Sequence, residues 1–291
     1  MAQERSFTGA ATRLGISQPS VSEMIKRLES QVGQPLFKRG ARRIELTVAG
    51  EALLGPALEL AMASDHAHHI ALRLRRQANG ILKLGAPYYT ANVAERNRLI
   101  GQFVSEHQRF SLDILHDWNQ NLVSKVQTGE IDMAFVQMPH LPPGLRQCLI
   151  HRSYSHYLVP QEHPLAGAES LHHADLAGHS VLTLAPSVDS WLYEWLYAPL
   201  EAHDAILIPS PEAHPDTMEQ FARLRRLILL RFGRNSSERG IEGDMVRIPA
   251  TPTAQIRSDI YIIRRDERGP DVAERFWKLA QKYEISQSAG G

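Results

Sequence analysis

The sequence predicts an α/β protein with three consecutive parts: a small helical domain over residues 1–50, a long helix over 51–79, and a strand-and-helix domain over 80–291. Three observations predict this order. Helix start and stop residues are closely spaced in the first part, an unbroken Ala- and Leu-rich stretch forms the second, and β runs alternate with helical runs in the third. At 291 residues the chain is long enough for two or more domains.

Two short helices are predicted near the N-terminus. The first covers residues 7–14 and ends at Gly15, a residue that readily adopts the left-handed conformation of a helix end. The second begins after Ser17 and has Pro19 in its first turn. Apolar side chains recur at helical spacing in the second helix and are expected to form a buried stripe: Val21, Ile25 and Leu28.

The opposite face of the second helix carries short polar groups first and cations later. A helix, a tight glycine turn and a second helix with a polar N-terminal end are the layout of a helix-turn-helix that reads DNA. The segment after Gly33, LFKRGARRIELT, combines turn residues with arginines and is predicted to form a wing along DNA phosphates.

From Ser6 through Gly50 the chain follows the pattern SFTxAAxxLxxSQPxxSxxIxxLExxxGxxLFxRxxRxxxLTxAG, where x is any residue. This segment closely resembles the N-terminal domain of the LysR-type transcriptional regulators, and the many fixed positions make the resemblance specific. The resemblance implies an N-terminal all-α winged helix-turn-helix and a linker helix that pairs with its copy in a second subunit. A two-lobed effector domain like that of the periplasmic binding proteins would follow.

The chain departs from the family pattern at two places. In that family another helix precedes the SFTxAA segment, whereas only residues 1–5 precede it here, so Leu14, Ile25 and Leu28 would lose part of their cover. Because two helices form too small a core to be stable alone, we expect the true translation start to lie upstream. Glu23 stands where family members often carry Arg or Lys. It either alters the base preference, by accepting from a cytosine amino group, or points to solvent.

The resemblance implies a homodimer or homotetramer that binds double-stranded DNA at an interrupted inverted repeat near a promoter. A small molecule would shift the arrangement of its subunits. Gln18 suits adenine through two hydrogen bonds, and the arginines suit phosphate or the minor groove. The candidate DNA contacts are Ser17, Gln18, Pro19, Ser20, Ser22, Lys26 and Arg27 on the second helix, and Arg39, Arg42 and Arg43 on the wing.

The composition is that of an ordinary globular protein, with 43% apolar residues and zero net charge. Residues 1–50 carry eight Lys and Arg against four Glu, a net charge of +4, so the remainder carries −4; a basic head suits phosphate. The single cysteine, Cys148, excludes an internal disulfide and suits the cytoplasm. The sequence has neither a secretory signal nor an apolar run of about 18 residues, so we expect no membrane partner.

Residues 48–78 are predicted to form one helix about 45 Å long. Its apolar stripe is too long for a small domain to cover, so a partner helix is expected, and Pro56 should kink the helix or mark a late first turn. His66, His68 and His69 suggest a metal site, but only His66 and His69 share a face and no acid or thiol accompanies them. We interpret them as a solvated surface and expect no metal or cofactor.

After residue 80, strands alternate with helices, which predicts a parallel sheet with helices on its faces. GEIDMAFV and YLVPQEHPLA resemble the family's third strand and the start of its second lobe. Lobe I would cover about 80–160 and 257–291, and lobe II about 161–256. The predicted strands are 81–87, 110–117, 131–137 and 257–265, and the predicted helices are 90–106, 119–128 and 271–283.

A ligand is expected beyond the carboxyl ends of the strands, in the cleft between the lobes. Thr90 at a predicted helix start would favour an anionic effector, or it would serve only as a helix cap. The aromatic helix WLYEWLY packs on the sheet or walls the cleft, and RRLILLRFGRN, whose only glycine is Gly233, would form the floor of lobe II. The candidate effector contacts are Tyr88, Tyr89, Thr90, Gln137, Met138, Thr183, Ser187 and His214.

Two other functions stay open. One is a cytoplasmic small-molecule binding protein whose DNA-binding head is inactive because the first helix is missing. The other is an enzyme on the same two-lobed fold. The sequence contains no Gly-x-Ser-x-Gly elbow, phosphate-binding Gly-rich loop or His-Glu-x-x-His motif, so we expect no catalytic residues.

Overall fold

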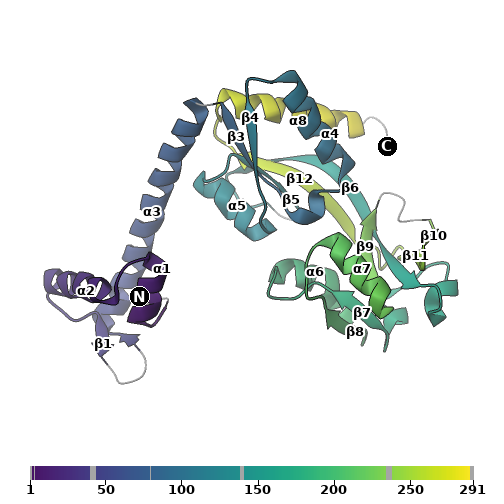
Figure 1. The fold of residues 1–291 in the computed structure, drawn as a ribbon, viewed down its shortest axis with the longest axis horizontal. Helices are drawn as coiled ribbons and strands as arrows, with labels where there is room; N and C mark the ends of the chain where they lie inside the picture. The colour runs from purple at the N-terminus through teal and green to yellow at the C-terminus, as the bar shows by residue number, and fades with distance from the viewer. Residues whose placement is uncertain are drawn as a thin grey trace. The chain divides into compact units, whose positions relative to one another are not determined.

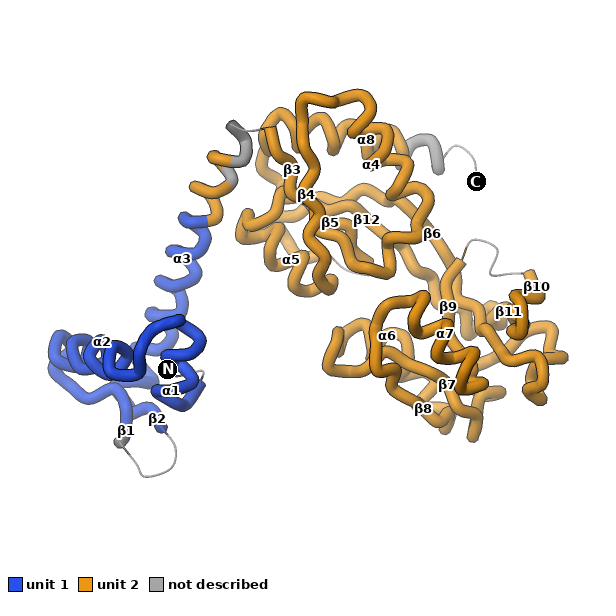
Figure 2. Tube along the Cα trace, in the orientation of Figure 1, with its two compact units in different colours: residues 1–68 blue, residues 69–291 orange. Residues whose placement is uncertain are grey.

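The computed structural model describes residues 2, 4–39, 44–78, 80–137, 141–233 and 238–288. The chain divides into two compact units, residues 1–68 and 69–291, shown in different colours in Figure 2. Figure 1 labels the helices and strands within each unit.

The first unit begins with the two short helices that the sequence predicts. In α1 (Phe7–Leu14) the Ser6 hydroxyl accepts a hydrogen bond from the backbone N–H of Gly9, and the helix ends at Gly15 with φ 64°. Helix α2 (Gln18–Val32) is capped by Ser17 and ends at Gly33 with φ 75°. Ala10, Ala11 and Val21 form the small core between the helices, with Phe7 and Ile25 partly buried against it.

The predicted apolar stripe on α2 is buried at one end only, and Leu14 and Leu28 show the reduced cover expected for them. Val21 is buried and Ile25 partly buried, but Leu28 is 39% exposed. Leu14, at the end of α1, is 61% exposed. The contact between α1 and α2 therefore covers only the first turns of the stripe.

A two-stranded hairpin follows α2, as the wing pattern predicts. Strands β1 (Phe37–Arg39) and β2 (Ile44–Leu46) pair antiparallel. The Glu29 carboxylate on α2 accepts hydrogen bonds from the backbone N–H groups of Leu36, at 2.8 Å, and Phe37, at 3.3 Å. Glu29 therefore fixes the start of the hairpin to the second helix.

Helix α3 (Val48–Ala78) has the predicted bounds, contains Pro56 and is 31 residues long. The Thr47 hydroxyl accepts from the backbone N–H of Gly50 at the helix start. His66 and His68 are exposed. Within the described residues, no three His, Cys, Asp or Glu side chains are placed to share a metal ion. None of the described helices is both long and apolar enough to cross a membrane. Several large apolar side chains of α3 are exposed: Leu58, Leu60, Met62, Leu72 and Leu74.

In the second unit, lobe I contains the predicted parallel sheet. The strand order is β4-β3-β5, and β12 joins β5 antiparallel. Helices α4 and α8 lie on one side of the sheet and α5 on the other (Figure 1). Helices α4 and α8 share one hydrophobic core with the sheet, where Phe103 and Phe276 meet edge to face at 5.0 Å, and α5 contributes to a separate core. The strands are β3 (Ile81–Gly85), β4 (Ser111–Leu115), β5 (Met133–Val136) and β12 (Arg257–Arg265), and the helices are α4 (Ala94–Glu106), α5 (Asn119–Thr128) and α8 (Asp271–Ser288).

Lobe II repeats this architecture on a smaller scale. Its central strand β7 pairs parallel with both β8 and β9. The strands are β7 (Ser180–Thr183), β8 (Ile206–Pro209), β9 (Ile228–Gly233), β10 (Gly240–Glu242) and β11 (Met245–Pro249). The helices are α6 (Ser190–Glu201) and α7 (Pro215–Arg225), with short 3₁₀ turns η2 (Pro164–Gly167) and η3 (His173–Leu176).

A single long strand, β6 (Leu145–Pro160, 16 residues), runs through both lobes. Its first part pairs antiparallel with β12, and its last part pairs with β9 on one edge and β11 on the other. This strand is not among those that the sequence predicts, because residues 145–160 carry only the resemblance to the start of the second lobe. The two lobes consequently share one continuous sheet.

The core of lobe I generates a stability prediction. Phe276 is fully buried, so Phe276→Ala should lower the free energy of unfolding by about 3–5 kcal/mol, through lost burial and the cavity left behind. Urea denaturation followed by circular dichroism measures this. Lys278→Ala, on the exposed side of the same helix, should change stability by less than about 0.5 kcal/mol. Equal effects of both substitutions would contradict the assigned core.

Candidate functional site

The first candidate site is the exposed face of α2. Ser17, Gln18, Pro19 and Ser20 are exposed at its N-terminal end. The hydroxyls of Ser17 and Ser20 lie 2.8 Å apart, and Ser17 also accepts from the backbone N–H of Ser20 at 3.3 Å. The Ser17 and Ser20 hydroxyls are therefore engaged in capping the N-terminus of the helix, whereas Gln18 beside them is an exposed amide.

The remaining candidate contacts of this site are less uniform. Lys26 and Arg27 are exposed, and Ser22 is half-buried. The Arg27 Nε donates to the Glu23 carboxylate at 3.2 Å. On the wing, Arg39 ends β1, while Arg42 and Arg43 lie outside the described residues. The candidate DNA contacts on α2 are therefore exposed, except for half-buried Ser22. The predicted contacts Arg42 and Arg43 of the wing are not tested.

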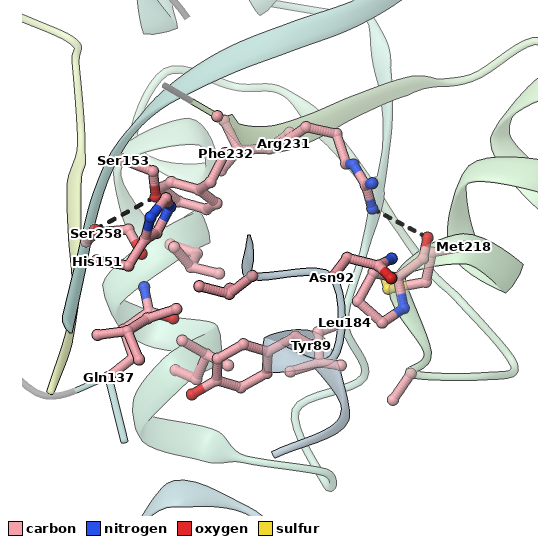
Figure 3. Close-up of a pocket in the computed structure, with 18 of the residues that line it drawn as sticks. Tyr89, Asn92, Gln137, His151, Ser153, Leu184, Met218, Arg231, Phe232 and Ser258 are labelled. Atoms are coloured by element: carbon pink, nitrogen blue, oxygen red, sulfur yellow. Dashed lines mark hydrogen bonds between the residues drawn. The ribbon is translucent and has the colours of Figure 1, made fainter. Parts of the chain in front are cut away.

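The second candidate site is a cavity of about 380 Å³ between lobes I and II (Figure 3). This volume is within the range of small-molecule sites, about 300–1,000 Å³. Most of its wall is apolar or aromatic, and both lobes contribute to it. The larger apolar side chains of the lining include Tyr89, Val93 and Trp118 from lobe I, Leu184, Leu192, Leu196, Tyr197, Met218, Leu229, Leu230 and Phe232 from lobe II, and Ile260 from β12.

Polar groups lie on two sides of the cavity. Figure 3 shows Gln137, His151, Ser153 and Ser258 on one side and Asn92 and Arg231 on the other. The Gln137 side chain is 6% exposed, and its Nε2 has no hydrogen-bond partner among the described residues. An unsatisfied buried donor costs about 1–3 kcal/mol, so a ligand oxygen at this position would be stabilised.

A buried carboxamide holds two residues of the cavity wall. The Oδ1 of Asn119 accepts from the Tyr89 hydroxyl at 2.6 Å and from the backbone N–H of Gln137 at 3.0 Å. Burial raises the pKa of Tyr89, so its hydroxyl stays protonated and keeps donating. Asn119 is fully buried at the start of α5. It therefore fixes the position of Tyr89 relative to Gln137.

Each charged side chain of the lining has a partner. The Nδ1 of His151 lies 2.8 Å from the Glu95 carboxylate, and both side chains are largely buried. Arg231 donates to the carbonyl oxygen of Pro215 at 3.1 Å and pairs with Glu219 at 3.3 Å. The charged side chains that line the cavity are therefore compensated within the described part of the protein.

Two of the predicted effector contacts, Tyr89 and Gln137, line the cavity. Tyr88 lies outside the lining, is 50% exposed and stacks on His116 at 4.5 Å. Met138 lies outside the described residues. The cavity is therefore approached from lobe I by the segment after β3 and the segment after β5, as the strand-end argument predicts.

The predicted role of Thr90 at a helix start is wrong. Helix α4 begins only at Ala94, after Val93, and Thr90 ends the short 3₁₀ turn η1 (Tyr88–Thr90). Its buried hydroxyl donates to the carbonyl oxygen of Pro87 at 2.7 Å. Because the hydroxyl is used inside the turn, it is not available to an anionic ligand.

The predicted contacts from lobe II do not line the cavity. Thr183 is buried and its hydroxyl donates to the carbonyl oxygen of Ile208 at 3.4 Å, while Ser187 is exposed. His214 caps α7, where its Nδ1 accepts from the backbone N–H of Asp216. The residues that do line it on this side come from Leu184, directly after β7, from α6, from the first turn of α7 and the residue Ala213 before it, and from β9.

The predicted effector contacts include no residue of β6 or β12, the paired strands that contribute to the cavity wall. His151 and Ser153 on β6, and Ser258 and Ile260 on β12, line the cavity. No local motif marks them, because their position depends on pairing between strands about one hundred residues apart in sequence. Arg231, in the segment expected to form the floor of lobe II, does reach the cavity.

The aromatic helix α6 is expected either to pack on the sheet or to form a wall of the cleft, and it does both. Trp191 and Trp195 stack on each other at 5.5 Å and pack against the core of lobe II. On the same helix Leu192, Leu196 and Tyr197 line the cavity. The helix therefore both covers the sheet and forms part of the cavity wall.

Two protein-family models match the chain. The model described as "Bacterial regulatory helix-turn-helix protein, lysR family" matches residues 1–51, and the "LysR substrate binding domain" model matches residues 75–284. Together they cover both candidate sites.

Individual proteins show the same similarity. The HTH-type transcriptional regulator BudR of Raoultella terrigena is 31% identical over 209 residues, which is 68% of each chain. Full-length CbnR complexed with its target DNA has a TM-score of 0.52 at 20% identity and covers 97% of this chain and 96% of its own. The effector binding domain of QuiR in complex with shikimate has a TM-score of 0.59 at 15% identity, over 72% of this chain and 98% of its own.

A buried histidine behind the cavity predicts a loss of stability on acidification. Burial, with Arg247 and Arg231 nearby, lowers the pKa of His156 to about 4 from its ordinary value near 6.5. Above pH 6.5 the ring is neutral in both the folded and the unfolded chain, so the full stability of the fold is present. As the pH falls from 6.5 toward 4, only the unfolded chain takes up the proton, and the fold loses stability. Between pH 7.5 and pH 5 the loss should be about 2 kcal/mol in the free energy of unfolding.

Urea denaturation at both pH values checks this expectation. His156→Gln should lose less stability between the two pH values than the unmodified chain, whatever its stability at pH 7.5. His66→Gln, at an exposed position on α3, should keep the full pH dependence. The same pH dependence in the His156 variant would show that another group is responsible.

Proposed function

The chain belongs to the LysR family of bacterial transcriptional regulators, and we propose which of its surfaces bind DNA and which bind the small-molecule effector. The match of both family models, over residues 1–51 and 75–284, carries this function. The protein is a DNA-binding regulator that senses a small molecule. The match at residues 1–51 disfavours the alternative of a binding protein with an inactive DNA head.

The exposed face of α2 is the proposed reading surface, because the second helix of a helix-turn-helix lies in the major groove with its N-terminal residues at the base edges. Gln18 would read bases there, and Lys26 and Arg27 would contact phosphate or base edges. Arg39, Arg42 and Arg43 of the wing would grip the backbone. CbnR, of the same fold, has been solved on its target DNA. Because a bacterial transcriptional regulator acts on chromosomal DNA, we place the activity of this chain in the cytoplasm.

The long helix α3 is the proposed dimerisation element. Leu58 and Met62, one turn apart, are 42% and 70% exposed, and Leu72, 37% exposed, continues the same face of the helix. Such a stripe on a helix favours burial against a second helix. A homodimer through α3, or a tetramer built from two dimers, would bring two reading helices to two half-sites.

The cavity between the lobes is the proposed effector site. Its apolar walls suit a compact hydrophobic body, and Gln137 Nε2 suits an acceptor oxygen such as that of a carboxylate, carbonyl or hydroxyl group. Since the wall charges are already paired, a full negative charge is not required. QuiR, of the same fold, holds shikimate in its effector domain. A small, mainly apolar molecule with at least one acceptor oxygen therefore fits best.

Gln18→Ala tests the reading surface. It should lower the preference for the target over a scrambled duplex more than it lowers affinity for the scrambled duplex, because a base contact is lost. Fluorescence anisotropy on a labelled duplex from the DNA flanking the gene measures both. Lys26→Ala, a phosphate contact, should weaken both duplexes alike and flatten the salt dependence. Equal losses on both duplexes with Gln18→Ala would refute the base contact.

Gln137→Leu tests the effector site. A thermal-shift screen of small carboxylic acids, alcohols, amides and amines should identify compounds that raise the melting temperature of the unmodified chain. Those compounds should contain an acceptor oxygen, and their affinity should fall about tenfold in Gln137→Leu, which removes the donor. Gln127→Leu, at an exposed position on α5, serves as the matched control. Hits that stabilise both variants equally would place the site elsewhere.

A further inference from the structure

Glu23 lies at the centre of the exposed face of α2. At 3.6 residues per turn, Val21 and Ile25 mark the buried side of the helix, and Glu23 and Arg27 lie opposite to it. Their side chains are 58% and 77% exposed. Glu23 is the sixth residue of α2, about one and a half turns after the Ser17 cap and Gln18. It therefore stands on the surface that would face the floor of the major groove.

The two glutamates of α2 differ in what the fold uses them for. Glu29 accepts from the backbone N–H groups of Leu36 and Phe37 and holds the wing. The Glu23 carboxylate has a single partner among the described residues, the Arg27 Nε at 3.2 Å. An exposed pair at this spacing stabilises a helix by only about 0.3–0.5 kcal/mol. The fold thus depends little on Glu23.

A carboxylate at this position is unfavourable for DNA binding in general. It would lie between two rows of phosphates and be repelled by both, and it withdraws Arg27 from phosphate. The repulsion is offset only where the groove offers a hydrogen-bond donor. Cytosine presents its N4 amino group there, and Glu accepts from it. The paired guanine presents the acceptors O6 and N7, which match an arginine.

We propose that Glu23 is a specificity-determining residue of this regulator, which selects a C·G pair. Its carboxylate accepts from the cytosine amino group. Its contact with Arg27 Nε orients the guanidinium, whose outer N–H groups then face guanine O6 and N7 on the same or the adjacent pair. Adenine is rejected because its N7 acceptor faces the carboxylate beside its amino group. This inference rests on the proposed entry of α2 into the major groove.

Selection of binding sites from a random duplex library by the full-length chain tests the proposal. The unmodified chain should enrich a motif with at least one position fixed as C, paired with G. In Glu23→Ala that position should become degenerate, with discrimination against other bases reduced about tenfold or more. In Glu23→Gln it should shift toward adenine, which Gln contacts through N6 and N7. Both variants should bind random duplex more tightly than the unmodified chain.

Glu45→Gln is the matched control, because Glu45 is an exposed carboxylate of the same unit that lies on β2, outside the reading helix. It should leave the motif unchanged while removing one negative charge. An identical motif from the unmodified chain and both Glu23 variants would overturn the inference and leave DNA binding by α2 intact. A library that yields no enriched motif with the unmodified chain would overturn the proposed DNA-reading function itself, and the inference with it.

Discussion

The pairing of strand β6 on both sides of the lobe boundary is the constraint on which the effector unit depends. Sixteen residues of extended chain span about 50 Å, enough to cross both lobes. Toward its start, β6 contributes Cys148 and Ile150 to the core of lobe I, and toward its end it contributes Tyr157 and Val159 to the core of lobe II. His151 and Ser153 lie between these two sets and face the cavity. The strand that joins the cores therefore also supplies one polar side of the site.

The second determinant of the cavity is the Asn119 carboxamide. Its single oxygen holds both the Tyr89 hydroxyl and the backbone of Gln137, so the aromatic wall and the polar donor are positioned together. With its backbone N–H satisfied by Asn119, Gln137 retains its side-chain amide for a ligand. A hydrogen bond between lobes, from Asn92 to Asp216 at 3.1 Å, closes another part of the lining. The proposed ligand contacts and the contacts between lobes thus involve neighbouring residues, an arrangement that would allow a ligand to change lobe geometry.

Local signals in the sequence were sufficient for most elements and insufficient for the site. The bounds of α1, α3 and α5 follow from caps, glycine stops and hydrophobic spacing, all of which act within a few residues. Thr90 shows the limit: it has the chemistry of a helix cap, but the carbonyl of Pro87 takes its hydroxyl in a 3₁₀ turn. Leu28 has the right spacing for burial, but no described residue covers it to the extent that Val21 is covered. His151 and Ser153 required knowledge of strand pairing over about one hundred residues, which no local pattern contains.

The ion pairs within residues 1–50 determine which of their cations are available to bind phosphate. By composition, residues 1–50 carry a net charge of +4, and every cation counts equally. In the structure Arg13 pairs with Glu4, Arg27 with Glu23 and Lys38 with Glu45. Among the described residues, Lys26 on α2 pairs with no carboxylate, so it is available to phosphate without breaking an ion pair. Arg27 has to exchange a carboxylate for DNA unless that carboxylate is itself satisfied by a base. In the proposed complex with DNA, the affinity of these residues for phosphate would depend on the bases that face Glu23, so the Arg27–Glu23 ion pair would couple sequence preference to charge.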